Sequence, residues 1–209
     1  MINLLLSILL WFIKFVPLFF INVFTMIFAP VICLFVTKAE ENSITGKPSM
    51  FPGKPREFLI KPLRWFQTTD APLDEFWYGD YAGWPKTGKT QADYDSSWYL
   101  RYRCRVAWVW RNPAYGFGTA WGFVDKDIVI ATVLDNEKDW NSGKNVHSYW
   151  VFVNSDGATG WCFRMQYYYY SSRCLEVFIG YKIMGDTIRG KKLVAMQITP
   201  FPIHPLKQT

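Results

Sequence analysis

The first 37 residues constrain this chain most, because they hold a single charge, Lys14, among long apolar side chains. From Phe15 to Thr37 the sequence runs for 23 residues without a charge. About 20 apolar residues are enough to cross the hydrocarbon core of a bilayer. Pro17 and Pro30 interrupt the run, but transmembrane helices tolerate proline. Residues 1–37 are therefore predicted to form a transmembrane anchor.

Two arrangements of this anchor fit the sequence. The 37 residues are too long for one span and slightly short for two full ones. One arrangement is a single span that follows an interfacial leader, and the other is a two-helix hairpin that bends near Lys14 and Pro17. A cleaved signal peptide fits poorly, because no basic residue precedes the first apolar run and no Ala-x-Ala-like site follows the second.

The rest of the chain has the composition of an ordinary soluble domain. Its 172 residues carry 22 Lys and Arg and 17 Asp and Glu, about 23% charged, against roughly 25% in typical domains. This balance excludes intrinsic disorder, and four cysteines are too few for a disulfide-rich scaffold. Aromatic residues stay frequent beyond the anchor, which makes them the best indication of a binding surface.

Residues 38–64 are predicted to form a basic, proline-rich tether, because their prolines and glycines disfavour both helix and internal strand. Basic residues beside a membrane are drawn to anionic lipid headgroups. The residues expected on the membrane surface are Lys38, Lys47, Lys54, Arg56 and Lys61. By the positive-inside rule they place the C-terminal domain in the cytoplasm, on the inner membrane, where its cysteines stay reduced.

Residues 65–209 are predicted to form an α+β domain in which one helix precedes an antiparallel β-meander. The helix is expected over residues 98–111, with an N-cap in Asp95-Ser96-Ser97 and an end at Asn112-Pro113. Arg101, Arg103 and Arg105 alternate as in a strand, against an otherwise helical spacing. Short β-branched and aromatic runs follow at residues 127–135, 148–154, 160–170, 174–183 and 191–199. Short connections between consecutive strands indicate antiparallel pairing.

One segment matches a nucleotide-binding pattern. Gly83 to Thr90 fits G-x-x-x-x-G-K-[ST], in which loop amides and a lysine hold phosphates. The surrounding sequence lacks the buried parallel strand and the helix that such a loop connects. Nucleotide binding is therefore kept only as a lesser alternative.

The sequence contains few of the residues that catalysis and metal binding usually require. The chain has two histidines, His147 and His204, and no C-x-x-C pair. We therefore expect no enzyme activity, no cofactor and no metal site. Beyond the anchor the net charge is +5, which is modest, so no nucleic-acid partner is expected either.

Several segments resemble an uncharacterised family of small membrane proteins encoded by tailed bacteriophages. They are the apolar N-terminus, W-F-x-T-T-D-A-P at residues 65–72, WVWRNPAYGFG at residues 108–118, GYK at residues 180–182 and QITPF at residues 197–201. The likeness covers roughly residues 59–201, and Tyr181 stands where a tryptophan is expected. The resemblance implies a viral origin and this architecture, but no mechanism and no catalytic residues.

We expect, on this basis, a phage-encoded protein in the host inner membrane that binds a host or phage protein without catalysis. Interfaces favour aromatic residues and arginine. The residues expected to bind the partner are Trp108, Trp110, Arg111 and Tyr115, next to a flexible aromatic turn at residues 115–118. The alternative is a structural virion or genome-ejection component. The lipid bilayer is the other expected partner, and a homo-oligomer is compatible with the sequence.

Overall fold

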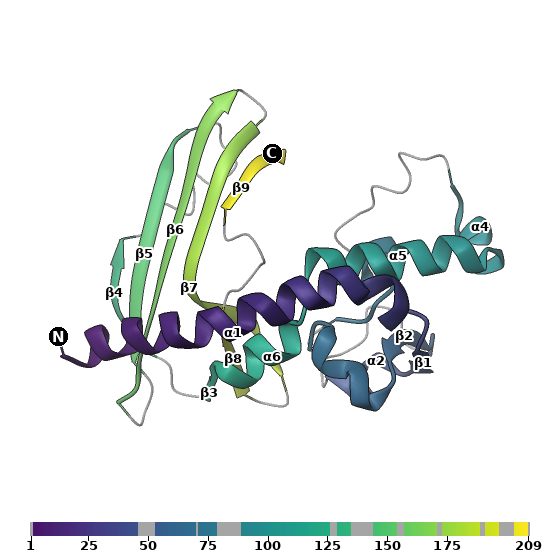
Figure 1. Cartoon of the computed structure of the whole chain (residues 1–209), viewed down its shortest axis with the longest axis horizontal. Helices are drawn as coiled ribbons and strands as arrows, with labels where there is room; N and C mark the ends of the chain where they lie inside the picture. Colours follow the sequence, from purple (N-terminus) through teal and green to yellow (C-terminus); the bar gives the residue numbers. More distant parts are fainter. Residues whose placement is uncertain are drawn as a thin grey trace. The chain divides into compact units, whose positions relative to one another are not determined.

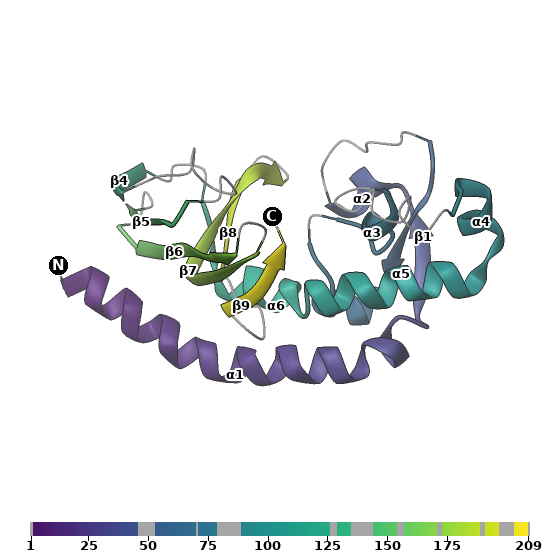
Figure 2. The ribbon, with the colours of Figure 1, turned by 90° about the horizontal axis from the view of Figure 1, so that it is seen from above.

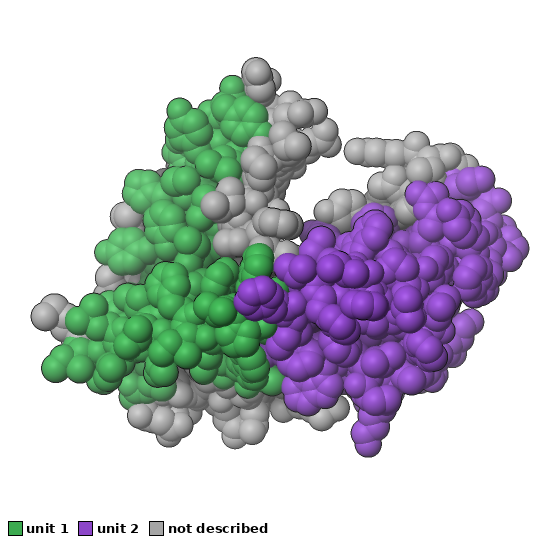
Figure 3. All heavy atoms as spheres, in the orientation of Figure 1, with its two compact units in different colours: residues 1–19, 118–209 green, residues 20–117 purple. Residues whose placement is uncertain are grey.

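The computed structural model describes residues 2–45, 53–69, 71–78, 89–125, 129–134, 144–153, 157–170, 173–188, 191–196 and 203–208. The chain divides into two compact units (Figure 3). We call residues Met1–Phe19 with Gly118–Thr209 the sheet unit, and Phe20–Phe117 the helix unit. Each unit contains part of the N-terminal helix.

Helix α1 (Ile2–Ile32) is continuous (Figure 2). The hairpin arrangement would need a turn near Lys14 and Pro17, and both residues are helical. By length and composition α1 is long and apolar enough to cross a membrane. Its buried positions recur every three, four or seven residues, which places them on one stripe of the helix. This buried stripe consists of Ser7, Trp11, Leu18, Asn22, Thr25, Ala29 and Ile32.

The helix unit contains more secondary structure than the sequence predicts. Its elements after α1 are β1 (Val36–Ala39), α2 (Glu41–Thr45), β2 (Arg56–Leu59), η1 (Lys61–Phe66), α3 (Glu75–Tyr78), α4 (Gln91–Ser96) and α5 (Trp98–Arg111). Strands β1 and β2 pair antiparallel, from Val36 with Leu59 to Ala39 with Arg56. The range expected to be a tether is thus partly folded, because all four residues of β2 are buried in the unit.

The core of the helix unit joins the end of α1 to β2 and α5. Its buried residues are Ala29, Ile32, Cys33, Leu59, Leu73, Val106, Trp108 and Val109. Helix α5 confirms the helix predicted over residues 98–111, and the Ser97 side chain caps it by accepting a hydrogen bond from the Leu100 amide. Arg101, Arg103 and Arg105, whose alternation suggested a strand, all lie in this helix. The Arg105 side chain is buried there and forms an ion pair with Glu57.

The sheet unit confirms the predicted antiparallel meander (Figure 1). Its strands are β3 (Phe123–Asp125), β4 (Val129–Leu134), β5 (Val146–Val153), β6 (Thr159–Tyr170), β7 (Arg173–Ile188), β8 (Lys191–Met196) and β9 (Ile203–Gln208). They pair in the order β3-β8-β7-β6-β5-β4, and β9 pairs with β7. Strands β3 and β9 were not predicted, since both are short and β9 contains a proline.

Helix α6 (Tyr115–Trp121) occupies the segment expected to be a flexible aromatic turn. The reason is a close approach of two backbones. The Gly116 amide donates a hydrogen bond to the Gln67 carbonyl, 3.0 Å away. A Cβ atom on Gly116 would lie 2.8 Å from the Trp65 Cα, so the glycine is needed for contact and not for flexibility.

Candidate functional site

The surface that stands out is the side of α1 opposite its buried stripe, which we call the apolar face. Its members are large hydrophobic side chains between 43% and 72% exposed. They are Ile2, Leu5, Leu6, Leu9, Leu10, Phe12, Ile13, Val16, Phe20, Phe24, Ile27, Phe28 and Val31. Together they expose on the order of 1,000 Å², whereas the largest apolar patch of a soluble monomer covers about 300–600 Å².

Three polar side chains of α1, those of Ser7, Asn22 and Thr25, lie on its buried stripe, whereas Asn3 is exposed. In the sheet unit, Ser7 donates a hydrogen bond to the Thr159 carbonyl. Trp11 donates from Nε1 to the Gly180 carbonyl at 3.0 Å, and its ring meets the edge of Trp161. Gly180 adopts φ +115°, a conformation that favours glycine. Asn22 and Thr25, in the helix unit, are also buried. The exposed side of α1 is therefore almost entirely apolar, whereas its buried stripe mixes polar and apolar side chains.

The helix unit also compensates for the proline near the end of α1. Pro30 has no N–H to donate to the Met26 carbonyl. Trp110 supplies the missing donor, since its Nε1 lies 2.8 Å from that carbonyl oxygen. Tyr102 likewise donates its hydroxyl to the Pro30 carbonyl at 2.9 Å. Two side chains of α5 therefore hold the end of α1 by its backbone.

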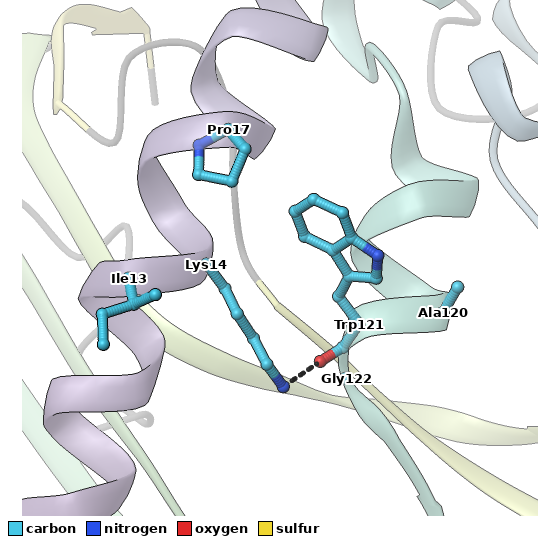
Figure 4. A pocket seen from close by; sticks show the side chains of 6 residues that line it. All are labelled: Ile13, Lys14, Pro17, Ala120, Trp121 and Gly122. Atoms are coloured by element: carbon cyan, nitrogen blue, oxygen red, sulfur yellow. Dashed lines mark hydrogen bonds between the residues drawn. The ribbon is translucent and has the colours of Figure 1, made fainter.

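A pocket of about 320 Å³ lies in the sheet unit beside α1 (Figure 4). It is lined by Ile13, Lys14, Pro17, Ala120, Trp121 and Gly122. The Lys14 side chain reaches across to the end of α6 and donates a hydrogen bond to the Trp121 carbonyl, 3.1 Å away. Lysine commonly binds the last carbonyls of a helix in this way. None of the described residues that line the pocket carries a carboxylate.

The four residues expected to bind a partner do not form one surface. Trp108 and Tyr115 are only 5% and 8% exposed, and Trp108 donates its indole N–H to the Thr68 hydroxyl. Trp110 and Arg111 are exposed. Aromatic residues are common both on binding surfaces and in protein cores. The sequence does not show which of these four side chains are buried, so it could not separate the two roles.

The five residues expected on the membrane surface also separate. Lys38 and Lys61 are exposed, and Lys54 lies over the Tyr78 ring at 4.7 Å. Lys47 falls outside the described residues. Arg56 differs from the described lysines of this set, because its side chain is 0% exposed.

Arg56 is the centre of a buried ion network instead. Its guanidinium contacts Asp74 at 3.0 Å, Glu41 at 3.3 Å and Glu75 at 2.9 Å. Burial raises the pKa of Asp74 to about 6, although the Arg56 charge opposes that rise. Next to this group, Arg105 contacts Glu57 at 2.7 Å. The network ties β2 to α2, α3 and α5, which is a structural role.

The segment that matches the phosphate-binding pattern is only partly described. Residues 83–88 lie outside the described residues. Thr90 is the N-cap of α4, where its hydroxyl and the Asp93 carboxylate form a capping box. The hydroxyl that would bind magnesium in a nucleotide site is thus used to begin a six-residue helix.

One face of the sheet carries polar groups that the sequence did not single out. Ser148, Arg164 and Phe178 lie opposite one another on β5, β6 and β7. Gln166 and Glu176 form the next row, and Arg164 contacts Glu176 at 3.3 Å. Within the described part of the chain, the buried atoms of this face that find no hydrogen-bond partner include Ser148 Oγ, Trp150 Nε1 and Tyr168 Oη. The alternation of side chains along each strand shows in the sequence which residues share a face. The register between neighbouring strands, which groups these residues into rows, comes only from the structure.

Comparison with known proteins yields one match. No curated protein and no solved structure is detectably similar to this chain. Residues 2–205 match a family of unknown function, DUF7338. The match covers nearly the whole sequence, including α1 and the sheet. The chain therefore belongs to the DUF7338 family.

Proposed function

We propose that this chain is a membrane-surface interaction protein that α1 holds on the bilayer. In this proposal α1 lies in the plane of the interface and inserts its apolar face among the lipids. The observation that carries the proposal is the division of α1 into a stripe that is buried against the protein and an exposed face of large apolar side chains. In interfacial helices the apolar side enters the boundary between headgroups and acyl chains, as this face would.

The packing of α1 favours this arrangement over a membrane crossing. Ser7, Trp11 and Leu18 are buried in the sheet unit, and residues 22–32 carry the buried positions in the helix unit. No stretch of about 20 residues is left with lipid-accessible sides all round, as a free span requires. A crossing would bring neighbouring polar elements into hydrocarbon, where each charged side chain costs at least about 3 kcal/mol.

Vesicle flotation tests the attachment. The full chain should float with phosphatidylcholine vesicles, and Phe20→Asp or Ile27→Asp should reduce the bound fraction by more than tenfold. Tyr167→Asp is the matched control, because Tyr167 is exposed on the sheet and should leave binding unchanged. A wild-type chain that stays soluble would refute the proposal.

Single engineered cysteines distinguish an α1 that lies on the membrane surface from an α1 that crosses the bilayer. All four native cysteines are buried, so Asn3→Cys, at an exposed polar position of α1 outside the apolar face, and Thr209→Cys should be the reactive sites in their variants. In sealed vesicles a membrane-impermeant maleimide should label both positions from the outside. Labelling of one position only, with the other protected until detergent is added, would show that α1 crosses the bilayer.

We further propose that the membrane is the inner membrane of a bacterial host and that the protein lies on its cytoplasmic side. Exposed Lys38 and Lys61 follow the anchor, and the cytoplasmic leaflet is anionic. The phage origin rests on the resemblance of residues 108–118 and its companion segments. A reporter fused after Thr209 that is active only in the periplasm would contradict this orientation.

The partner is proposed to be a protein of the host or the phage. Trp110 and Arg111 are the exposed residues of the segment 108–118, which carries part of the family resemblance. Crosslinking and pull-down from infected-cell membranes should capture a partner, and Arg111→Ala should reduce the yield. The matched control is Arg103→Ala, another exposed arginine of α5. Detection of the chain in purified virions by mass spectrometry would favour a structural or ejection role instead.

A further inference from the structure

We propose that the pocket beside Lys14 binds the phosphate headgroup of an anionic phospholipid. The inference rests on the proposed function, because it assigns a lipid class to the same membrane-facing surface. It does not follow from membrane attachment alone, since an apolar face would bind neutral and anionic lipids alike.

The first argument is the charge of the pocket. Lys14 is the only charged residue before position 38. Its ammonium has three N–H donors, and the structure shows one of them bonded to the Trp121 carbonyl. Among the residues that the structure describes, the pocket lining contributes no carboxylate to pair with this charge. A phosphate oxygen would supply both the missing acceptors and the missing charge.

The second argument is the shape and position of the pocket. Its volume of about 320 Å³ lies at the small end of the range for ligand pockets, about 300–1,000 Å³. That size suits a headgroup more than a whole lipid. Two of its walls, Ile13 and Pro17, are exposed on α1, and Ile13 belongs to the apolar face. A lipid could thus place its phosphate at Lys14 and its acyl chains along that face.

The third argument is the tryptophan. The Trp121 ring forms a wall of the pocket beside Pro17, as Figure 4 shows. Tryptophan is enriched where the headgroups of a bilayer meet its hydrocarbon. An indole, a lysine and an apolar helix face therefore meet at the depth where a phospholipid changes from polar to apolar.

Native mass spectrometry of the full chain in neutral detergent tests this assignment, because no charged bilayer is present to bind basic residues diffusely. The probes are phosphatidylglycerol and phosphatidylcholine, added separately. The wild-type chain should retain one phosphatidylglycerol and at least fivefold less phosphatidylcholine. Lys14→Met should abolish that preference, Lys14→Arg should keep it, and Lys144→Met, at an exposed lysine of the sheet unit outside the pocket, should not change it.

A second variant covers the case in which Lys14→Met fails to fold because α6 loses its terminal bond. Trp121→Ala removes the ring that forms a wall of the pocket and leaves both Lys14 and its carbonyl acceptor in place. It should also abolish phosphatidylglycerol retention. Equal retention of both lipids by the wild type, or full retention by Trp121→Ala, would overturn the assignment. Those results would leave flotation with neutral vesicles intact, whereas failure of the proposed function would abolish flotation itself.

Discussion

Replacing Arg56 with methionine separates the two roles that this residue could have. Methionine keeps much of the apolar length of the side chain and removes the guanidinium. The side chain is 0% exposed and contacts three carboxylates, those of Glu41, Asp74 and Glu75. Removing it leaves buried carboxylates without their cation, which typically costs about 3–5 kcal/mol.

The loss should depend on pH in a defined direction. The Arg56 charge lowers the pKa of Asp74, which burial nevertheless raises to about 6. Without Arg56 the pKa of Asp74 rises further, so Asp74 becomes protonated at mildly acidic pH. The variant then no longer buries an unpaired negative charge at this position. The destabilisation should therefore be largest near about pH 8 and clearly smaller near about pH 5.

Denaturant unfolding in neutral detergent, followed by tryptophan fluorescence, measures the effect. Lys61→Met is the matched control, because Lys61 is an exposed cation of the same segment and its loss should change stability by less than about 0.5 kcal/mol. A loss below about 1 kcal/mol for Arg56→Met, equal at both pH values, would refute the buried network. A membrane-surface role would instead weaken vesicle binding by about 1 kcal/mol and leave unfolding unchanged.

Four further predictions follow from single contacts. Asp74→Asn should flatten the pH dependence of stability, because burial raises the native pKa of Asp74 from 3.8 to about 6. Protonated Asp74 therefore contributes about 3 kcal/mol to the free energy of unfolding below about pH 3.8, and this contribution is lost as the pH rises through about 6. Unfolding curves recorded across this pH range measure the difference. Gly116→Ala should destabilise by about 2–4 kcal/mol through its clash with the Trp65 backbone, whereas Gly157→Ala, which meets open space at φ +79°, should cost about 1 kcal/mol in the same assay. Ser148→Ala should leave stability unchanged or raise it by up to about 1 kcal/mol, because its hydroxyl is buried without a partner in the described residues; a loss above about 1 kcal/mol would show that a water or ligand binds it. Burial raises the pKa of Cys104 and Cys162 to about 12, so iodoacetamide should alkylate them only after denaturation, as read by mass spectrometry.

Local patterns predicted much of the fold. Ser97 and Asn112-Pro113 bounded α5 correctly, and the short apolar runs after residue 127 predicted the meander. These signals succeed because a helix cap and a two-residue alternation act within a few residues of sequence.

The parts that sequence could not supply depend on distant contacts. Prolines and lysines around β2 are typical of a tether, yet Arg56 meets carboxylates 15 to 19 positions away and the segment folds. The Lys14 pocket needs α6, more than 100 residues along the chain, as its second wall. Trp108 and Trp110 are neighbours of the same type in one helix, and only packing shows that the first is core and the second exposed.

The hydrogen bond from Trp110 to the Met26 carbonyl has a consequence for how the anchor can evolve or be engineered. A generic apolar helix of equal hydropathy would still enter lipid, but it would not present a carbonyl freed by proline to the Trp110 indole. Exchanging α1 for such a helix should preserve the proposed membrane attachment while destabilising the helix unit. Conversely, lipid that binds the apolar face stabilises only the folded state, so the whole unit should resist unfolding better on vesicles than in solution.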